Sequence, residues 1–194
     1  MTYPNRETVL LHELIHHAAL LAPDAPALDD GGCKLTYHQL QAHVDACANG
    51  LIGVGLARGD RVGIWLEKRL ETVVASFGAP AAGGVMVPMN PLLKPEQVLY
   101  IARDCNVRVL ITSPDRLALL APLLAEAATA APDLVHMVLI APSALPIPLP
   151  PHMALHTWQA MLEASAAAGH RVIDTDTTAI LYTSGSPADP RAWC

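Results

Sequence analysis

The stretch from Arg61 to Ile140 constrains the fold most, because short apolar runs alternate in it with segments of helical length. The apolar runs predict buried strands, and the segments between them carry the end signals of helices. Buried strands that alternate with helices are typical of a parallel sheet covered on both faces. We therefore expect an α/β fold with a mostly parallel sheet flanked by helices. Its strands are predicted over 61–66, 85–88, 107–112 and 134–140, and its helices over 70–82, 95–105 and 113–129.

Two helices and a short hairpin are predicted before this stretch. The first helix is amphipathic, because apolar residues recur at helical spacing at Leu11, Leu14, Ile15, Ala18 and Ala22. A turn over 29–32 separates two short strands. Thr36 and Gln39 then fit a capping box that begins the second helix. The buried face of this helix is expected to carry Leu40, Val44, Cys47 and Leu51, and Gly53 and Gly55 end it.

The chain after Ile140 ends in a candidate loop for an anion. A Pro-rich excursion over 142–151 is followed by a predicted helix over 157–168 and a strand over 179–182. This strand breaks into Thr183-Ser184-Gly185-Ser186. Small residues let backbone N–H groups approach an anion, and hydroxyls add donors, so these four residues favour the start of a phosphate-binding loop. A Ser/Gly turn after a strand is the alternative.

Composition narrows the class of function. The net charge of −6 over 194 residues gives no basic patch, which argues against a nucleic-acid partner. Four cysteines lie far apart with no Cys-x-x-Cys pair, so we expect neither a zinc framework nor disulfides, but a reducing, cytoplasmic setting. The beginning of the chain lacks the pattern of a signal peptide. Uncharged stretches over 72–93 and 134–162 are broken by Gly and Pro, so we expect no membrane span.

Three other motifs are weaker. His12-Glu13-Leu14-Ile15-His16 matches the H-E-x-x-H pattern of zinc metallohydrolases, yet a third ligand is not evident, and the polar side of a helix is the favoured interpretation. The glycines over 53–59 follow a helix and precede a strand, which is the reverse of a dinucleotide-binding loop. Asp174 and Asp176 flank a turn, and a solvated turn is favoured over a catalytic pair of carboxylates.

The order of these features resembles the AMP-forming adenylating enzymes: acyl-CoA synthetases, peptide-synthetase adenylation domains and luciferases. The resemblance rests on four stretches in family order, Leu35-Thr36-Tyr37, Gly59 to Ile64, Ala82 to Pro91 and Leu181 to Ser186. Two further stretches, 66–69 and 90–97, resemble the acyl-CoA ligases associated with exosortase A systems. The expected fold is then the first subdomain of the adenylating-enzyme N-terminal domain, formed by residues 1–186.

The resemblance also implies a reaction and its cofactors. Thr183, Ser184, Gly185 and Ser186 would bind the β- and γ-phosphates of ATP while a small-molecule carboxylate attacks the α-phosphorus. Pyrophosphate leaves, and the thiol of CoA or of a carrier protein then displaces AMP from the acyl-adenylate. Mg²⁺ and a loop lysine would neutralise the charge that builds on the phosphates. No catalytic or metal-binding residue of this chain is assigned, and fatty acid metabolism is the expected setting.

Residues 187–194 depart from the family, whose loop continues T-S-G-S-T-G-x-P-K-G. Deleting one nucleotide from codons for Thr-Gly-Arg-Pro-Lys-Gly-Val-Val, with a pyrimidine following the last codon, yields the observed Pro-Ala-Asp-Pro-Arg-Ala-Trp-Cys. We therefore hypothesise that residues 187–194 are a frameshifted tail, that the remainder of the ligase is missing, and that the chain is inactive alone. A non-catalytic fragment or weak phosphate-binding module is the alternative. Pro80 is a second departure, because the family usually has Leu or another helix former at this place in the predicted helix. A proline inside a helix costs about 3 kcal/mol.

Overall fold

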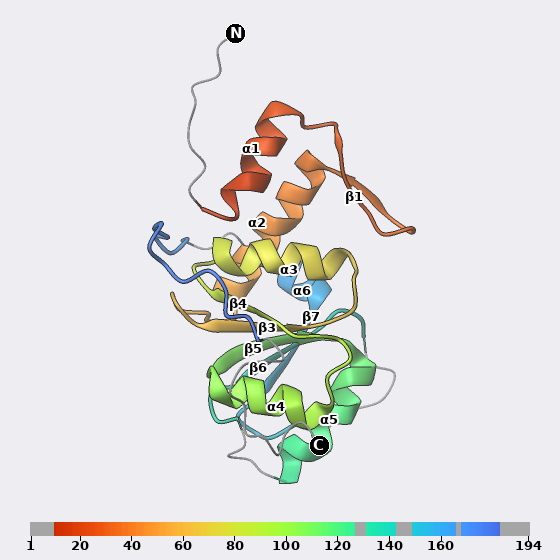
Figure 1. Ribbon diagram of the computed structural model, residues 1–194, viewed down its shortest axis with the longest axis vertical. Coiled ribbons are helices and arrows are strands. Elements are labelled where there is room, and N and C mark those ends of the chain that lie inside the picture. Colours follow the sequence, from red (N-terminus) through yellow and green to blue (C-terminus); the bar gives the residue numbers. More distant parts are fainter. Residues whose placement is uncertain (1–9, 127–130, 143–148, 166–167, 183–194) are drawn as a thin grey trace.

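A five-stranded parallel sheet forms the centre of the protein, which confirms the prediction of a mostly parallel sheet (Figure 1). The computed structural model describes residues 10–126, 131–142, 149–165 and 168–182. Every neighbouring pair in the sheet is parallel, so each connection crosses over a face of the sheet. In spatial order the strands are β4 (Val85–Pro88), β3 (Arg61–Trp65), β5 (Val107–Thr112), β6 (His136–Leu139) and β7 (Ala154–Thr157).

Helices cover both faces of this sheet, which confirms the predicted α/β class (Figure 1). One face carries α2 (Tyr37–Gly53), α3 (Leu70–Ala81) and α6 (Trp158–Leu162), and the other carries α4 (Pro95–Asp104) and α5 (Pro114–Glu126). Helix α1 (Glu13–Leu21) packs on the outside of α2. The antiparallel hairpin of β1 (Pro26–Asp29) and β2 (Lys34–Thr36) joins α1 to α2.

Two apolar clusters hold these layers together, one on each face of the sheet. The first joins α2 and α3 to the sheet, for example through Val74 and Ile111. The second joins α4 and α5 to the opposite face, for example through Val98, Leu117 and Leu110. All five of these side chains are fully buried. The neighbours Leu110 and Ile111 thus point to opposite faces of β5, which explains why the strand reads as a continuous apolar run.

The predicted start of the second helix is confirmed in detail. Thr36 Oγ1 accepts from Gln39 N–H at 3.3 Å, and Gln39 Oε1 accepts from Thr36 N–H at 2.9 Å. The predicted face is buried in full at Leu40, Val44, Cys47 and Leu51. Burial raises the pKa of the Cys47 thiol to about 12, so this side chain serves as a small apolar group.

The first helix is present, but its buried face differs from the predicted one. Ile15 and Ala19 are buried, whereas Leu14 is 50% exposed and Ala22 lies after the helix. Among the described elements, helix α1 packs mainly against α2. One narrow stripe of apolar residues is therefore enough to hold it there. The pattern predicted the helix correctly and overestimated how much of it is covered.

The prediction after Ile140 needs two corrections. Strand β7 was missed, because only His156 of its four residues is even partly buried and the apolar signal is weak. The helix predicted over 157–168 ends at Leu162, after one turn and a half. Part of the Pro-rich excursion, residues 143–148, lies outside the described residues.

The uncharged stretch over 72–93 folds into two core elements instead of one long helix. Residues 72–93 contribute most of α3 and all of β4. Within the described ranges, no helix combines the length and apolar character that crossing a membrane requires.

Candidate functional site

The segment that leads into the predicted phosphate loop lies against the edge strand β4. Met86 N–H donates to the Thr178 carbonyl at 3.0 Å, and Ile180 N–H donates to the Met86 carbonyl at 3.0 Å. Met86 and Ala179 thus form one parallel bridge, where the sequence predicted a full strand over 179–182. Because the segment runs parallel to β4, it leads toward the carboxyl edge of the sheet, where α/β folds bind ligands.

An ion pair holds this segment where it starts, near the amino edge. Arg58 forms a two-pronged contact with Asp176, with Nε–Oδ2 at 3.1 Å and Nη2–Oδ1 at 2.5 Å. The Arg58 hydrogen bond holds the pKa of Asp176 below its usual range. Asp176 is therefore a partner of a residue 118 positions away, while Asp174 is exposed as predicted. A pocket of about 500 Å³ opens beside this pair, lined also by Arg61, Gly83 and Thr177.

A second contact holds the segment immediately before the predicted loop. The Tyr182 hydroxyl donates to Asp104 Oδ2 at 2.5 Å, at the end of α4. Burial, together with this hydrogen bond, raises the pKa of Tyr182 above its ordinary value. Ile180 and Tyr182 pack against the second apolar cluster, and Leu181 between them is 65% exposed. The chain is thus fixed on both sides of Ala179, up to the residue that precedes Thr183.

The predicted loop itself, Thr183, Ser184, Gly185 and Ser186, lies outside the described residues, as does the tail 187–194. Its assignment to ATP phosphates stays a prediction.

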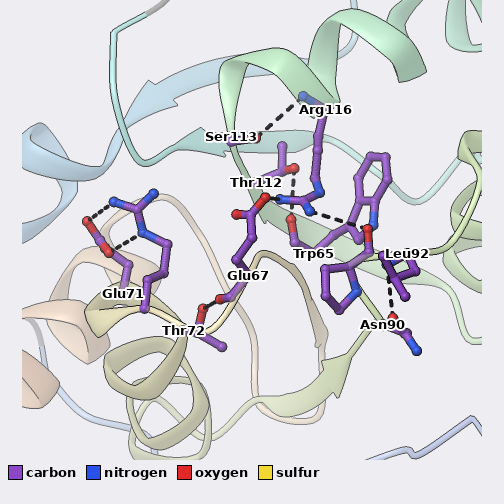
Figure 2. Close-up of polar contacts among 11 residues, drawn as sticks. Trp65, Glu67, Glu71, Thr72, Asn90, Leu92, Thr112, Ser113 and Arg116 are labelled. Carbon is purple, nitrogen blue, oxygen red and sulfur yellow. Dashed lines mark hydrogen bonds and ion pairs between the residues drawn. The ribbon is translucent and has the colours of Figure 1, made fainter. Parts of the chain in front are cut away.

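A polar cluster, which we call the Arg116 cluster, occupies the carboxyl ends of β3 and β4 (Figure 2). It consists of Trp65, Glu67, Pro91 and Arg116. Arg116 Nη1 lies 2.5 Å from Glu67 Oε1, and Arg116 Nη2 donates to the Pro91 carbonyl at 3.3 Å. The guanidinium also stacks over the Trp65 ring, 5.4 Å from the centroid. The contact with Arg116 lowers the pKa of Glu67.

Neighbouring hydroxyl and amide groups support this cluster (Figure 2). Thr112 donates to the Trp65 carbonyl at 3.1 Å, and Thr72 donates to the Glu67 carbonyl at 2.6 Å. Asn90 Oδ1 accepts from Leu92 N–H at 2.9 Å and shapes the loop after β4. Sequence reasoning missed Arg116. Its position in the first turn of the helix after a buried strand was the available signal, because that turn lies at the carboxyl edge.

The H-E-x-x-H residues do not form a zinc centre with the rest of the described chain. His16 Nδ1 lies 2.7 Å from the Gln41 side-chain nitrogen, and His12 Nδ1 is buried without a hydrogen-bond partner. Burial lowers the pKa of His12. These side chains and Asp45 line a pocket of about 250 Å³. In the part of the chain that the structure describes, no group of three or more His, Cys, Asp or Glu residues could hold a metal ion.

Gly53 is the last residue of α2, and Gly55 and Gly59 lie in the turn between α2 and β3, as predicted. Gly55 and Gly59 adopt positive φ angles of 97° and 83°, and Asp60 Oδ2 accepts from Ala57 N–H at 2.9 Å. The order of helix, turn and strand excludes a dinucleotide-binding loop at this place.

Comparisons with known proteins agree on one family. The family model described as "AMP-binding enzyme" matches residues 15–192. A long-chain-fatty-acid–CoA ligase of Bacillus subtilis is 35% identical over 102 residues, which cover 53% of this chain and 18% of that protein. A linear gramicidin synthase polypeptide of Brevibacillus parabrevis is 30% identical over 190 residues, which cover 97% of this chain and 2% of that protein.

Solved structures agree in fold. The anthranilate CoA ligase AuaEII, solved with anthranoyl-AMP, superposes with a TM-score of 0.71 at 26% identity, covering 91% of this chain and 32% of that one. VinN, solved with 3-methylaspartate, gives 0.67 at 26% identity, covering 92% and 45%. The chain thus spans less than half of these structures and less than a fifth of the two curated relatives above. The family match includes residues 187–192, so the separate origin of the tail stays a prediction, as does the exosortase-associated subgroup.

Proposed function

This chain belongs to the AMP-binding enzyme family, and from that premise we propose that it is part of an AMP-forming carboxylate ligase. In the proposed reaction a carboxylate oxygen attacks the α-phosphorus of ATP and pyrophosphate leaves. A thiol of CoA or of a carrier protein then attacks the acyl carbonyl, and AMP leaves. The acyl-CoA ligase and the peptide synthetase among the relatives support these two acceptors. Cytoplasmic ATP and CoA would supply the reaction.

The pairing of Thr178 to Ile180 with β4 is the observation that carries this proposal. The pairing directs the chain toward the carboxyl edge of the sheet, and Tyr182 is held by Asp104 immediately before Thr183. Thr183, Ser184 and Ser186 offer hydroxyl and backbone donors, which fit the oxygens of the β- and γ-phosphates. Donors fixed before the reaction stabilise charge that develops on the leaving pyrophosphate.

Within the Arg116 cluster, little positive charge is left to neutralise the phosphates of ATP. Arg116 is the cation of the Arg116 cluster at the carboxyl edge, and the Glu67 carboxylate already balances its charge. Mg²⁺, when bound with ATP, would supply the neutralising charge together with a loop lysine. The family's lysine position falls within residues 187–194, which contain no lysine.

We therefore propose that residues 1–186 are the first subdomain of such a ligase and that residues 187–194 are frameshifted. The 194-residue chain would then be inactive, and at most a weak phosphate binder. Sequencing the gene through codon 187 tests this part. A gene that reads without interruption, and whose other frames encode no Thr-Gly-Arg-Pro-Lys-Gly, would refute the frameshift.

ATP–pyrophosphate exchange tests the ligase itself, with fatty acids, aryl acids and amino acids as the carboxylates. We expect no exchange with the 194-residue chain and exchange with the product of the frame-restored gene. Exchange by the short chain would refute its inactivity, and a frame-restored protein that is folded but inactive with every acid would count against the ligase.

Loop variants of the frame-restored protein then test the site. Ser184→Ala is expected to lower kcat by about 10²-fold, as the loss of one positioned donor does. Thr177→Ala is the matched control, because this exposed hydroxyl lies before the bridge to β4 and should leave the rate unchanged.

A further inference from the structure

Two histidines face each other across the last two strands of the sheet. His136 begins β6 and His156 lies in β7, and the two strands are parallel neighbours (Figure 1). His136 Nδ1 and His156 Nε2 are 3.2 Å apart, with ring centroids at 5.2 Å and a tilt of 51°. His156 is paired in register with Val138, and side chains at every second strand position share a face. Both rings therefore lie on the face that α2, α3 and α6 cover.

The distance between these two nitrogens fits a shared metal ion. A zinc–imidazole bond is about 2.1 Å, so two nitrogens 3.2 Å apart that bind one ion subtend an angle of about 100°. This angle lies between the octahedral and tetrahedral values. Both side chains are partly buried, so neither is a long, freely moving surface group. Because the two nitrogens now point at each other across a hydrogen bond, each ring would have to turn so that its lone pair points at the shared ion.

We propose that His136 and His156 together bind a borderline divalent cation such as Zn²⁺, and that the ion links β6 to β7. In the described part of the chain no third His, Cys, Asp or Glu completes a set of three, so water would fill the other positions. Imidazole nitrogen suits Zn²⁺, Cu²⁺ and Ni²⁺, whereas Mg²⁺ prefers oxygen. The site is thus separate in chemistry from the Mg²⁺ that accompanies ATP.

The site is also separate in place, because His136 lies at the amino end of β6 and the proposed ATP loop approaches the carboxyl edge. Arg108, on the adjacent strand β5, is the nearby cation that acts on His136. Asp60 lies 3.8 Å from the Arg108 guanidinium and offsets part of its repulsion of a metal ion.

Metal binding requires a defined rearrangement of protons. Without metal, one ring donates an N–H to the lone pair of the other across the 3.2 Å contact. With metal, both facing nitrogens present lone pairs, and each neutral ring carries its proton on its other nitrogen. The change is a tautomeric shift in one ring, so no proton is released and no bond to carbon changes.

An ion at this place would reinforce the weakest strand of the sheet. Strand β7 pairs only with β6 in the described sheet, and its burial pattern shows three exposed residues out of four. Two protein ligands are about half of a structural zinc set, so we expect a Kd of roughly 1–100 μM. At a zinc concentration of about 100 times Kd, Tm should rise by about 5–10 °C.

Calorimetric zinc titration of the untagged 194-residue chain tests the site. His136→Gln and His156→Gln are each expected to weaken zinc binding at least tenfold and to abolish the Tm rise. His152→Gln is the matched control, because this exposed histidine precedes β7 in the same segment. His12→Gln tests the H-E-x-x-H motif, and both controls should bind zinc as the unchanged chain does.

Several results would overturn the proposal. These are no binding at 1 mM Zn²⁺, undiminished binding in both site variants, or loss of binding in His12→Gln. A Tm rise with Mg²⁺ equal to that with Zn²⁺ would also contradict it. If a site variant fails to fold, the Cu²⁺ electron paramagnetic resonance spectrum of the unchanged chain decides, because two coordinated nitrogens are expected and a spectrum without nitrogen coupling refutes the pair.

Discussion

The hydroxyl of Thr112 donates a hydrogen bond of 3.1 Å to the carbonyl oxygen of Trp65, and the bond ties the carboxyl end of β5 to that of β3. Thr112 is fully buried. Among the described residues, no other polar or charged side chain is buried in the core. Trp65 in turn carries the Arg116 guanidinium on its ring. One buried hydroxyl therefore helps to hold Trp65 in place under the Arg116 guanidinium.

Replacing this hydroxyl should lower the stability of the fold. Thr112→Val keeps the shape of the side chain and removes the donor, so we expect the free energy of unfolding to fall by about 1 kcal/mol. Urea denaturation measures the change. Thr112→Ser keeps the hydroxyl and is the control for the bond. Equal stability of Thr112→Val and the unchanged chain would show that the bond contributes nothing.

Gly50 should tolerate no larger residue, although it lies inside α2. A Cβ at this position would overlap the carbonyl oxygen and Cγ of Met161 in α6, which crosses α2 there. We expect Gly50→Ala to destabilise the protein by about 3 kcal/mol or more, since backbone would have to move.

Gly53, in the same helix, is the matched control for Gly50. A Cβ there would lie 3.7 Å from Ala164 Cβ, which is ordinary contact. Gly53→Ala should therefore raise stability by at most about 1 kcal/mol through helix propensity. Thermal denaturation of both variants checks the prediction, and a stable Gly50→Ala would mean that α6 packs differently on α2.

Two helix prolines should respond differently to replacement. Pro122 lies inside α5 and is exposed, so Pro122→Ala restores a helical hydrogen bond at no loss of packing and should stabilise by about 1–3 kcal/mol. Pro80 lies in the last turn of α3 and is buried. Pro80→Ala should gain less, because the lost contacts oppose the gain. A larger rise in Tm for Pro80→Ala than for Pro122→Ala would contradict this order.

The Glu67–Arg116 pair should make stability depend on pH in the acid range. Arg116 lowers the pKa of Glu67 in the folded protein below its ordinary value of 4.5. A carboxyl group whose pKa is lower when folded stabilises the fold above the unfolded pKa, and this contribution is lost as the pH falls through the folded pKa. The Glu67 side chain is 58% exposed, so solvent keeps the contribution to at most about 1 kcal/mol.

Comparison with Glu67→Gln isolates this contribution. The unchanged chain should be the more stable of the two at pH 6, and the difference should shrink as the pH falls below about 4.5. Urea denaturation across that range measures it. A difference that stays constant would show that Arg116 does not hold the carboxylate.

The tertiary structure supplied contacts that no local pattern displays. Strand β7 escaped prediction because an exposed edge strand needs few apolar residues, and its pairing with β6 is what defines it. Asp176 looked like a solvated turn residue until its contact with Arg58 appeared. The helical glycine Gly50 carried no signal of its crossing with α6.

The sequence by itself determined the α/β class, the strands β3, β4 and β5, and the capping box at Thr36, because apolar periodicity and short-range hydrogen bonds are local properties. It also pointed to the family through an ordered set of motifs. Only the tertiary structure decided which charges are compensated, as for Arg116, and which side chains meet across strands, as for His136 and His156. Those contacts depend on chain packing over long sequence separations, which residue order does not reveal until the sheet is assembled.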